Sequence, residues 1–412
     1  MKRGFYTILA AQFFSALADN ALLFAAIALL KELNAPDWHT PLLQEAFVIS
    51  YIVLAPFVGA FADSLPKGQV MFICNAIKLV GCVGMLLGLN PLLAYAIVGF
   101  GAAAYSPAKY GILTEYLPPE KLVMANSWME GLTVAAIVLG AIVSGIIIRP
   151  TIAASMLGWW DVPFINTGID TAPELAIVIV TSLYLLASMF NLYIPRVQID
   201  HKPLSNDPIF LMKEFWHCSK LLWKDPLGQV SLAVTTLFWG SGATLRFIVL
   251  AWAAVALNYD QSSAANLIAC VAVGIAIGSV LAAQLVRIEH TVKVIPVGIG
   301  MGLVVLAMIP VTSPTVAIIL LIAIGAMGGY FVVPMNALLQ HRGHLLMGSG
   351  SSIAVQNLYE NMSIAVMLGL YTAMGIMHLN IYTIILVFGL LLSGIMAALY
   401  KKHGHDQDGG RI

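Results

Sequence analysis

The stretch from Ala11 to Leu30, AQFFSALADNALLFAAIALL, has the length and apolar character of a membrane-spanning helix, yet Asp19 and Asn20 lie at its centre. A carboxylate at mid-bilayer depth costs ~2.5–3.5 kcal/mol on insertion scales, so it normally faces a protein interior or a water-filled cavity. Gln12, Ser15 and Asp19 fall on one face of such a helix. That face must therefore meet a polar partner, which is either a base on another helix or a bound substrate or ion.

The composition places the whole chain in a membrane. Of its 412 residues, 60% are hydrophobic and only 10% are charged, whereas soluble domains carry about 25% charged residues. Soluble classes are thereby excluded, and a net charge of zero gives no indication of nucleic-acid binding. Apolar stretches long enough to span a bilayer occur near residues 7–31, 44–62, 70–89, 92–113, 122–148, 174–195, 229–257, 265–286, 293–310, 314–337, 350–375 and 379–400. We therefore expect an all-α membrane protein with twelve transmembrane helices.

Lysine and arginine are unevenly distributed over the predicted connections. If both termini are cytoplasmic, the outer side carries only Lys31 and Arg149. The inner side then carries Lys2, Arg3, Lys67, Lys121, Arg196, Lys202, Lys213, Lys220, Lys224, Arg287, Lys293, Arg342, Lys401, Lys402 and Arg411. The positive-inside rule predicts this orientation. The first hydrophobic run is too long for the h-region of a signal peptide, so we expect it to remain as a helix.

The chain is expected to divide into two six-helix halves. We predict an N-terminal half at 1–195, a cytoplasmic linker at 196–228, a C-terminal half at 229–402 and a disordered cytoplasmic tail at 403–412. Within the linker, Pro208 to Lys224 is expected to form an amphipathic helix lying on the inner leaflet. Its apolar residues are Ile209, Met212, Phe215, Trp216, Leu222 and Trp223, and its basic face carries Lys213, His217, Lys220 and Lys224.

The two halves resemble repeats of one another. In the fourth helix of each half a glycine precedes a proline by the same interval, and in the fifth an acid precedes a hydroxyl residue by the same interval. The pairs are Gly101 and Pro107 with Gly328 and Pro334, and Glu130 and Thr133 with Glu360 and Ser363. Two six-helix halves related in this way resemble the major facilitator superfamily fold.

Six charged side chains fall within the predicted spans, and their charges balance. The acids are Asp19, Glu130 and Glu360, and the bases are Lys78, Lys109 and Arg246. Such a balance is expected if these charges face one another in a shared cavity and not lipid. Arg246 offers an always-charged planar fork of donors, which suits a phosphate or a carboxylate; the alternative is a structural pair with Asp19. Lys78 has no partner that the sequence identifies, and Glu130 is expected to be a structural acid.

Other polar side chains join this set. Glu360 lies in a cluster with Gln356, Asn357 and Asn361, which predicts a water-filled site. Lys109 follows Pro107, which frees backbone groups that a cavity or neighbouring helix must satisfy. Lys109 also lies in the cytoplasmic third of its span, so snorkelling to the interface is an alternative. The candidate substrate-binding residues are Asp19, Asn20, Lys109, Arg246, Gln356, Asn357 and Glu360.

The segment from Gly59 to Gly68, GAFADSLPKG, resembles the GxxxD loop of the superfamily. In that loop the aspartate pairs across neighbouring helices and holds the outward-facing state. Ser64 occupies the position at which the loop has a basic residue, and the first basic residue, Lys67, lies three residues further along the chain. The resemblance implies a conformational, gating role for Asp63 with Lys67.

Six longer motifs resemble the LplT family of bacterial lysophospholipid transporters over nearly the whole chain. They are AQFFSALADNALLF, APFVGAFADS, GAAAYSPAKYGIL, TLFWGSGATLRF, GGYFVVPMNALLQ and AVQNLYEN. The resemblance implies an inner-membrane flippase that moves lysophospholipids from the outer to the inner leaflet, without energy coupling. The chief substrate would be lysophosphatidylethanolamine, with lysophosphatidylglycerol and lysocardiolipin also taken. A partner acyltransferase/acyl-carrier-protein synthetase would then re-acylate them.

The charges of those motifs fall on Asp19, Lys109, Arg246 and Glu360. A phosphoethanolamine head group is zwitterionic, so its ammonium requires a carboxylate and its phosphate requires arginine or lysine. We expect Asp19 and Glu360 to attract the ammonium, and Arg246 and Lys109 to hold the phosphate. The alternative is a proton-coupled solute or drug antiporter in which Asp19 or Glu360 titrates.

A membrane-embedded enzyme is a third reading, but the chain offers no nucleophile with an oriented base. His403, His405 and Asp406 in the tail are interpreted as a chance cluster, and the four cysteines show no metal-site spacing. We therefore expect a monomeric transporter that catalyses no reaction and uses no cofactor, metal or nucleic acid.

Overall fold

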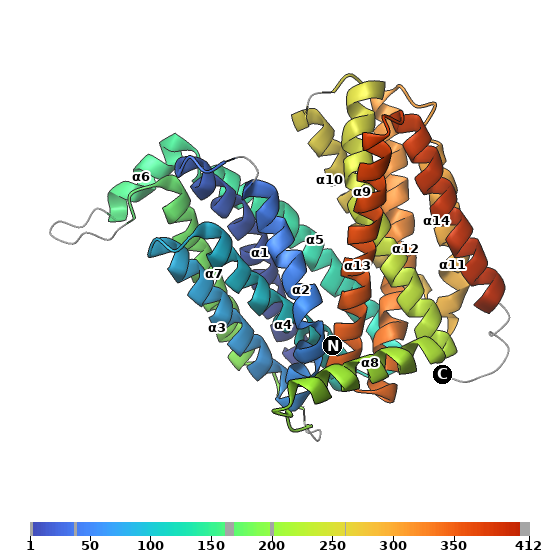
Figure 1. The fold of residues 1–412 in the computed structure, drawn as a ribbon, viewed down its shortest axis with the longest axis horizontal. Coiled ribbons are helices and arrows are strands. Elements are labelled where there is room, and N and C mark those ends of the chain that lie inside the picture. Colours follow the sequence, from blue (N-terminus) through green and yellow to red (C-terminus); the bar gives the residue numbers. More distant parts are fainter. Residues whose placement is uncertain (1–2, 37–38, 161–168, 198–201, 260, 404–412) are drawn as a thin grey trace. The chain divides into compact units, whose positions relative to one another are not determined.

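A computed structural model describes residues 3–36, 39–160, 169–197, 202–259 and 261–403 (Figure 1). Every regular element within these ranges is a helix. The α-helices are α1 (Arg3–Glu32), α2 (His39–Ser64), α3 (Lys67–Leu86), α4 (Pro91–Tyr116), α5 (Leu122–Ile147), α6 (Pro150–Trp160), α7 (Ala172–Leu192), α8 (Pro208–Lys224), α9 (Pro226–Ala256), α10 (Gln261–Leu285), α11 (Ile295–Leu306), α12 (Pro314–Leu346), α13 (Ser349–Ile376) and α14 (Ile381–His403). Two short 3-10 helices are η1 (Pro119–Lys121) and η2 (Ile288–Val294).

The predicted all-α fold is confirmed. Each predicted span coincides with one α-helix, but the span at 293–310 coincides with the 12-residue α11, which directly follows η2. The two further α-helices are α6 and α8, of which α8 has the predicted bounds. In the described part of the chain, 11 helices are long and apolar enough to cross a membrane when η2 is counted with α11. The remaining predicted span, α13, is 28 residues long but is not among them. The Gln356–Asn361 cluster supplies the polar side chains that lower its hydropathy.

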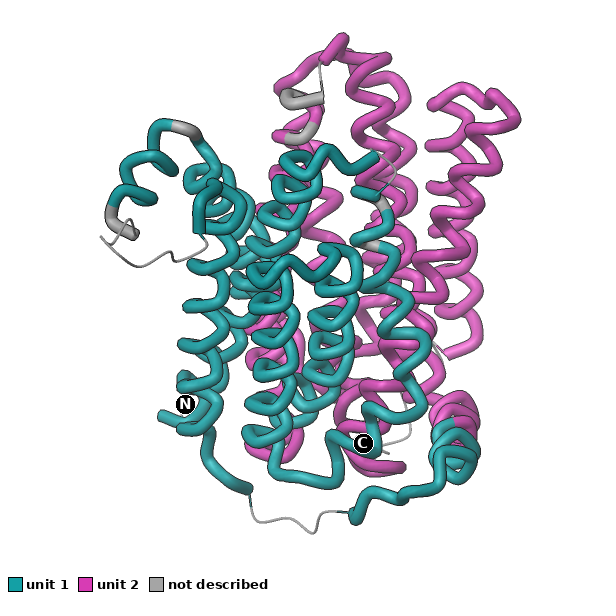
Figure 2. The backbone as a smooth tube through the Cα atoms, turned by 60° about the vertical axis from the view of Figure 1, so that its left-hand side comes forward, with its two compact units in different colours: residues 1–112, 132–215 teal, residues 113–131, 216–412 magenta. Residues whose placement is uncertain are grey.

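The chain forms two compact units (Figure 2). Unit 1 contains residues 1–112 and 132–215, and unit 2 contains residues 113–131 and 216–412. The first turns of α5 belong to unit 2, where Asn126 and Gln340 exchange two amide hydrogen bonds of 2.9 and 2.8 Å. The predicted boundaries at 195 and 229 concern the internal repeat and stay a prediction.

Close helix packing in unit 1 depends on small residues. A Cβ added at Gly140 of α5 would lie 2.9 Å from Asn20 Cβ and 3.0 Å from Ala21 N on α1. A Cβ added at Gly101 of α4 would lie 2.7 Å from the Cys74 carbonyl oxygen on α3. Backbones approach this closely where glycine is present, which is the usual device for helix association in membranes. These contacts pack α5 against α1 and α4 against α3.

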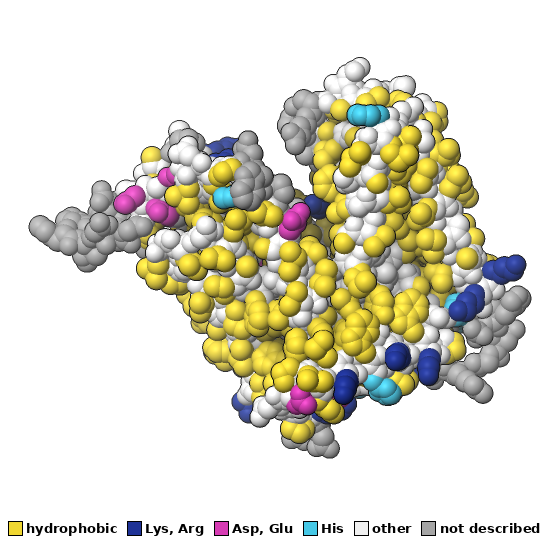
Figure 3. Space-filling view, viewed as in Figure 1, with side chains coloured by type: hydrophobic (Ala, Val, Ile, Leu, Met, Phe, Trp, Pro, Cys, Tyr) yellow, Lys and Arg dark blue, Asp and Glu magenta, His cyan; other side chains and the backbone are white. Residues whose placement is uncertain are grey.

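Unit 2 uses the same device between α10 and α12. Gly274 and Gly278 on α10 face Gly325 and Gly329 on α12, and a Cβ at any of the four would collide with the backbone of the opposite helix. Outside these seams, apolar side chains cover the visible face of the helices, while lysine and arginine gather near the helix ends (Figure 3). This distribution is expected of helices that face lipid along their length.

Candidate functional site

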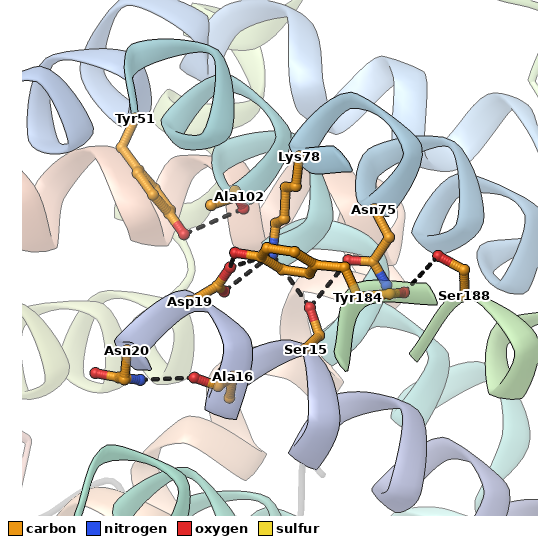
Figure 4. A network of polar contacts seen from close by, with 10 residues as sticks. All are labelled: Ser15, Ala16, Asp19, Asn20, Tyr51, Asn75, Lys78, Ala102, Tyr184 and Ser188. Carbon is orange, nitrogen blue, oxygen red and sulfur yellow. Dashed lines mark hydrogen bonds and ion pairs between the residues drawn. The ribbon is translucent and has the colours of Figure 1, made fainter. Parts of the chain in front are cut away.

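Asp19 on α1 forms a partly buried ion pair with Lys78 on α3 (Figure 4). Lys78 Nζ donates to Asp19 Oδ1 at 2.8 Å and to Asp19 Oδ2 at 2.9 Å. The Tyr184 hydroxyl on α7 donates to Asp19 Oδ1 at 2.6 Å. The Lys78 side chain is 0% exposed, whereas that of Asp19 is 24% exposed. The carboxylate is therefore neutralised from the protein side and remains accessible from the other.

A second layer of polar groups holds Lys78 in place. Its ammonium donates to Ser15 Oγ at 3.1 Å, and Ser15 donates to Asn75 Oδ1 at 3.0 Å. The ammonium also lies 4.7 Å from the ring centroid of Tyr105 and 5.4 Å from that of Tyr184. Buried charges persist where hydrogen bonds and aromatic faces satisfy them in this way. Lys78 is thus a fixed charge of unit 1.

The partner of Asp19 is the one base to which the sequence assigned no role. A basic partner on another helix was one of the two expected alternatives, and Lys78 is that partner. Lys78 was counted in the charge balance of the spans. Spacing along the sequence does not show which residues of α1 and α3 lie at the same height, so it could not identify Lys78 as the partner of Asp19. The pair does not exclude substrate binding, because the exposed fraction of Asp19 leaves room for a second cation.

Asn20 and Gln12 have structural partners in unit 1. The Asn20 amide donates to the Ala16 carbonyl of its own helix at 2.8 Å. Gln12 donates to Thr133 Oγ1 on α5 at 3.3 Å. One amide N–H of Asn20 is thus hydrogen-bonded within its own helix, and the substrate-binding role of Asn20 stays a prediction.

Lys109 on α4 lies away from the Asp19 network. A Cβ added at Gly101 would lie 2.8 Å from Lys78 Cγ, which sets the register between α3 and α4. Lys109 follows Gly101 by eight residues, or about 12 Å along the axis at 1.5 Å per residue. Its ammonium lies 4.4 Å from the ring centroid of Tyr110. Asp19 and Lys109 therefore cannot contact the same small group at once.

Asp63 and Lys67 of the GxxxD-like segment form an ion pair, and their gating role stays a prediction. Lys67 Nζ lies 2.7 Å from Asp63 Oδ1 and donates to the Ala62 carbonyl at 2.7 Å. Lys67 is only 3% exposed. A Cβ added at the following Gly68 would lie 3.0 Å from the Asn191 carbonyl oxygen, so α3 begins against the end of α7. Lys67, four residues after Asp63, thus contacts this aspartate across the turn between α2 and α3.

In unit 2, Glu360 lies in the polar cluster predicted for α13. Gln356 Nε2 donates to Glu360 Oε1 at 2.7 Å and to Asn336 Oδ1 on α12 at 2.9 Å. Asn357 is buried, and its carbonyl accepts from Asn361 at 2.8 Å. The Gln356 Oε1 atom has no hydrogen-bond partner, and Glu360 has no ion-pair partner, among the described residues. Asn336 is the member of this cluster that the sequence did not indicate.

Arg246 on α9 is exposed and makes no hydrogen bond or ion pair with any residue that the structure describes. The register of α9 on α13 is set by Gly240 against Ser363 and by the rings of Phe247 and Tyr371, which lie 6.2 Å apart. The two helices therefore run parallel.

In this register Arg246 lies level with Leu370, ten residues beyond Glu360. This separation is about 15 Å along the axis. Arg246 and Glu360 are therefore two separate charged positions on unit 2, and one small group cannot contact both. The prediction that the charges of both halves share one cavity stays a prediction.

No metal-binding cluster of three or more His, Cys, Asp or Glu side chains occurs among the described residues. His403 is the last residue of α14 and is buried, while His405 and Asp406 lie outside the described ranges. The four charged candidate residues, Asp19, Lys109, Arg246 and Glu360, all lie within the described ranges, and their ligand stays a prediction.

Comparison with known proteins agrees with this architecture. A protein from Serratia proteamaculans (strain 568) named lysophospholipid transporter LplT is 44% identical over 373 residues, covering 90% of this chain and 88% of that protein. The LplT of Yersinia pestis (strain Pestoides F) is also 44% identical, covering 90% of this chain and 87% of its own.

Solved structures show the same fold. The transporter FucP in the outward conformation matches with a TM-score of 0.71 at 14% identity, covering 96% of this chain and 97% of that chain. A bacterial homologue of the iron transporter ferroportin in the outward-facing state matches with a TM-score of 0.69 at 18% identity, covering 98% and 100%. The family model described as Major Facilitator Superfamily matches residues 8–359. The chain therefore belongs to the Major Facilitator Superfamily, and within it to the LplT family.

Proposed function

We propose that this protein is a lysophospholipid transporter of the bacterial inner membrane, with both termini cytoplasmic. It moves lysophosphatidylethanolamine and related lysolipids from the outer to the inner leaflet by uncoupled alternating access. There a lysophospholipid acyltransferase/acyl-carrier-protein synthetase re-acylates them. The observation that carries this proposal is the identity of 44% over 90% of the chain to proteins named lysophospholipid transporter. The charged residues of unit 1 and unit 2 supply the chemistry.

The Asp19–Lys78 pair suits a zwitterionic head group. Lys78 is fully buried and its charge is balanced by Asp19, so the pair attracts neither free cations nor free anions strongly. The exposed part of the Asp19 carboxylate offers acceptor positions to an ammonium that arrives together with its own phosphate. A neutral pair of this kind favours a head group whose own charges also cancel.

Arg246 is the natural phosphate ligand of unit 2. Its guanidinium is exposed and has no partner among the described residues, and its fork of donors matches a phosphate oxygen pair. Glu360 lies about 15 Å away along the helix axis, and a head group reaches only one of them at a time. The C-terminal part of α9 is expected on the outer side, so Arg246 contacts the lipid before Glu360 does.

The acyl chain is expected to stay in contact with apolar side chains or with the bilayer during transfer. Each CH₂ group opposes exposure to water by ~0.8 kcal/mol. A sideways exit between helices satisfies this requirement, because the head group can bind the charged side chains Asp19, Arg246 and Glu360 while the acyl chain remains in an apolar environment. The protein therefore binds the head group, and most of the acyl chain stays in the bilayer.

The phosphate role of Arg246 can be tested with purified protein in liposomes. A lysophosphatidylethanolamine labelled on its acyl chain keeps both head-group charges, and albumin extraction from one leaflet reports its transfer. Arg246→Gln is expected to slow transfer of zwitterionic and anionic lysolipids alike, since both carry the phosphate. Lys401→Gln, which removes an exposed base at the end of α14, is the matched control. Unchanged transfer by Arg246→Gln would show that this arginine holds no phosphate.

Proton-coupled antiport is the second candidate, and Glu360 is the observation in its favour. This carboxyl is 8% exposed and has no ion-pair partner among the described residues. Intramembrane acids of this kind serve as proton carriers in other transporters. Substrate-driven proton movement that is lost in Glu360→Gln would support antiport, whereas transport that is independent of a proton gradient would exclude it.

A further inference from the structure

Helix α8, which links the two halves and which the proposed transport does not use, has three distinct faces. One face is buried against the protein and carries Leu211, Phe215, Cys218 and Leu222. A second is apolar but exposed, with Ile209 at 64%, Met212 at 45% and Trp216 at 49% exposure. A third is exposed and basic, with Lys213, His217, Lys220 and Lys224. Only the first face is buried, and the other two are exposed.

The helix is fixed at the end of the membrane-spanning bundle. Ser219 and Tyr359 of α13 share a hydrogen bond of 2.9 Å, and the Trp223 and Tyr359 rings lie 5.5 Å apart. Asp225 caps α9 by accepting from Gly228 N at 2.7 Å, so α8 ends one residue before that cap. Figure 1 shows α8 lying crosswise where α9 begins. Because α9 is a candidate membrane span, α8 lies at the level of the membrane surface.

The order of the faces around α8 matches a membrane surface. At ~100° per residue, the exposed apolar stripe runs from Met212 through Trp216 to Ile209, and the basic stripe from Lys220 to His217 lies directly beside it. Apolar side chains at this depth can enter the acyl region, while the lysines extend to phosphates above them. The only acid of the helix, Glu214, lies outside both stripes, with an oxygen 4.0 Å from Lys202 Nζ. The exposed surface of α8 therefore has an apolar stripe beside a basic stripe that contains no acidic residue.

We propose that α8 binds the head groups of anionic phospholipids in the leaflet on its own side of the membrane, which the positive-inside pattern makes the cytoplasmic one. The lysines bind the lipid phosphates, and Trp216 and Ile209 insert between the acyl chains. The charge of the stripe selects the ligand, because basic residues near a membrane surface attract anionic lipid with about fivefold gain each. This inference does not depend on which solute the transporter carries.

Lipid retention tests the basic stripe. The purified protein is titrated with phosphatidylglycerol or with phosphatidylethanolamine, and bound lipid is counted by native mass spectrometry. The triple variant Lys213→Gln, Lys220→Gln, Lys224→Gln is expected to bind phosphatidylglycerol at least ~10-fold more weakly, with phosphatidylethanolamine unchanged. A triple variant at Lys121, Arg287 and Lys293, all exposed and outside α8, is the matched control. Equal binding by the α8 variant and the wild type would overturn the proposal.

Membrane depth tests the apolar stripe. The four native cysteines are replaced, transport is verified, and a spin label is attached at Trp216→Cys or at Lys121→Cys in vesicles of phosphatidylethanolamine and phosphatidylglycerol. The label at 216 is expected to be relaxed more by oxygen than by a water-soluble nickel complex, and the label at 121 the reverse. Stronger relaxation by the nickel complex at position 216 would place this stripe in water and overturn insertion. A label at 216 shielded from both agents would indicate a protein partner and would also overturn it.

Discussion

Removal of Lys78 is the perturbation whose consequence the structure defines most closely. In Lys78→Met, the Asp19 carboxylate loses two donated hydrogen bonds and its only cation among the described residues, and it keeps only the Tyr184 hydroxyl. Breaking a buried ion pair by deleting one partner costs ~3–5 kcal/mol, because the remaining charge is left uncompensated. Asp19→Asn should also be destabilising, because it leaves the fully buried Lys78 ammonium without a counter-charge, although the Asn amide oxygen can still accept from Lys78 and from the tyrosine.

The double variant Lys78→Met, Asp19→Asn separates ion pairing from packing. Replacing both charges of a buried pair is often nearly neutral, so the double variant should be more stable than Lys78→Met alone. The two changes should thus be non-additive by at least ~1–3 kcal/mol, as is found for contacting residues.

Thermal unfolding of the purified protein in detergent measures this cycle. One kcal/mol shifts the midpoint by ~2–4 °C for domains of about 150–250 residues, the size of unit 1, so Lys78→Met should unfold ~6–20 °C below the wild type. The exposed base Lys401→Met is the matched control and should leave the midpoint unchanged. If the double variant loses as much as both single variants combined, Asp19 and Lys78 do not stabilise one another.

Three further outcomes follow from packing and hydrogen bonding. Gly101→Ala should lower the unfolding midpoint, because the added methyl meets the α3 backbone at 2.7 Å and overpacking costs ~1–3 kcal/mol, whereas Gly145→Ala, with nothing within 4 Å, should be harmless. Tyr184→Phe should lower the free energy of unfolding by ~1.5–3 kcal/mol, because it removes the 2.6 Å hydrogen bond from the tyrosine hydroxyl to the Asp19 carboxylate. An effect no larger than that of a Tyr→Phe change at an exposed tyrosine would argue against that hydrogen bond. Asn126→Leu should destabilise by ~1–3 kcal/mol in thermal unfolding because the buried Gln340 amide loses its partner, and the double variant with Gln340→Leu should recover part of that loss; no recovery would refute the pairing.

Much of the fold is readable from apolar run length, because a helix must be about 20 residues long to span the hydrocarbon core. The twelve spans and the bounds of α8 follow from this rule and from helical periodicity. The polar face of α1 is equally predictable, since Gln12, Ser15 and Asp19 share it by spacing alone. What it faces is not predictable in this way.

The unpredicted features of the site are contacts between helices. The pairing of Asp19 with Lys78 depends on the close approaches that glycines such as Gly101 permit, and a single sequence carries no register for them. The same limit applies to Arg246 and Glu360. Both were expected to serve one head group together, but the register of α9 on α13 separates them by about 15 Å. Charge counting named the charged residues within the spans, and their substrate-binding role stays a prediction. Only the structure shows how Arg246 and Glu360 are spaced along the helices of unit 2.

Uptake and re-acylation of labelled lysophosphatidylethanolamine tests lysolipid transport most directly. The measurement uses cells that lack their own transporter and receive this protein or its Asp19→Asn variant, each with and without a protonophore. We predict that the wild type restores uptake, that the protonophore does not abolish it, and that Asp19→Asn reduces it. Absence of uptake by well-expressed wild type would contradict the proposed function, and uptake abolished by the protonophore would replace uncoupled transport with proton coupling.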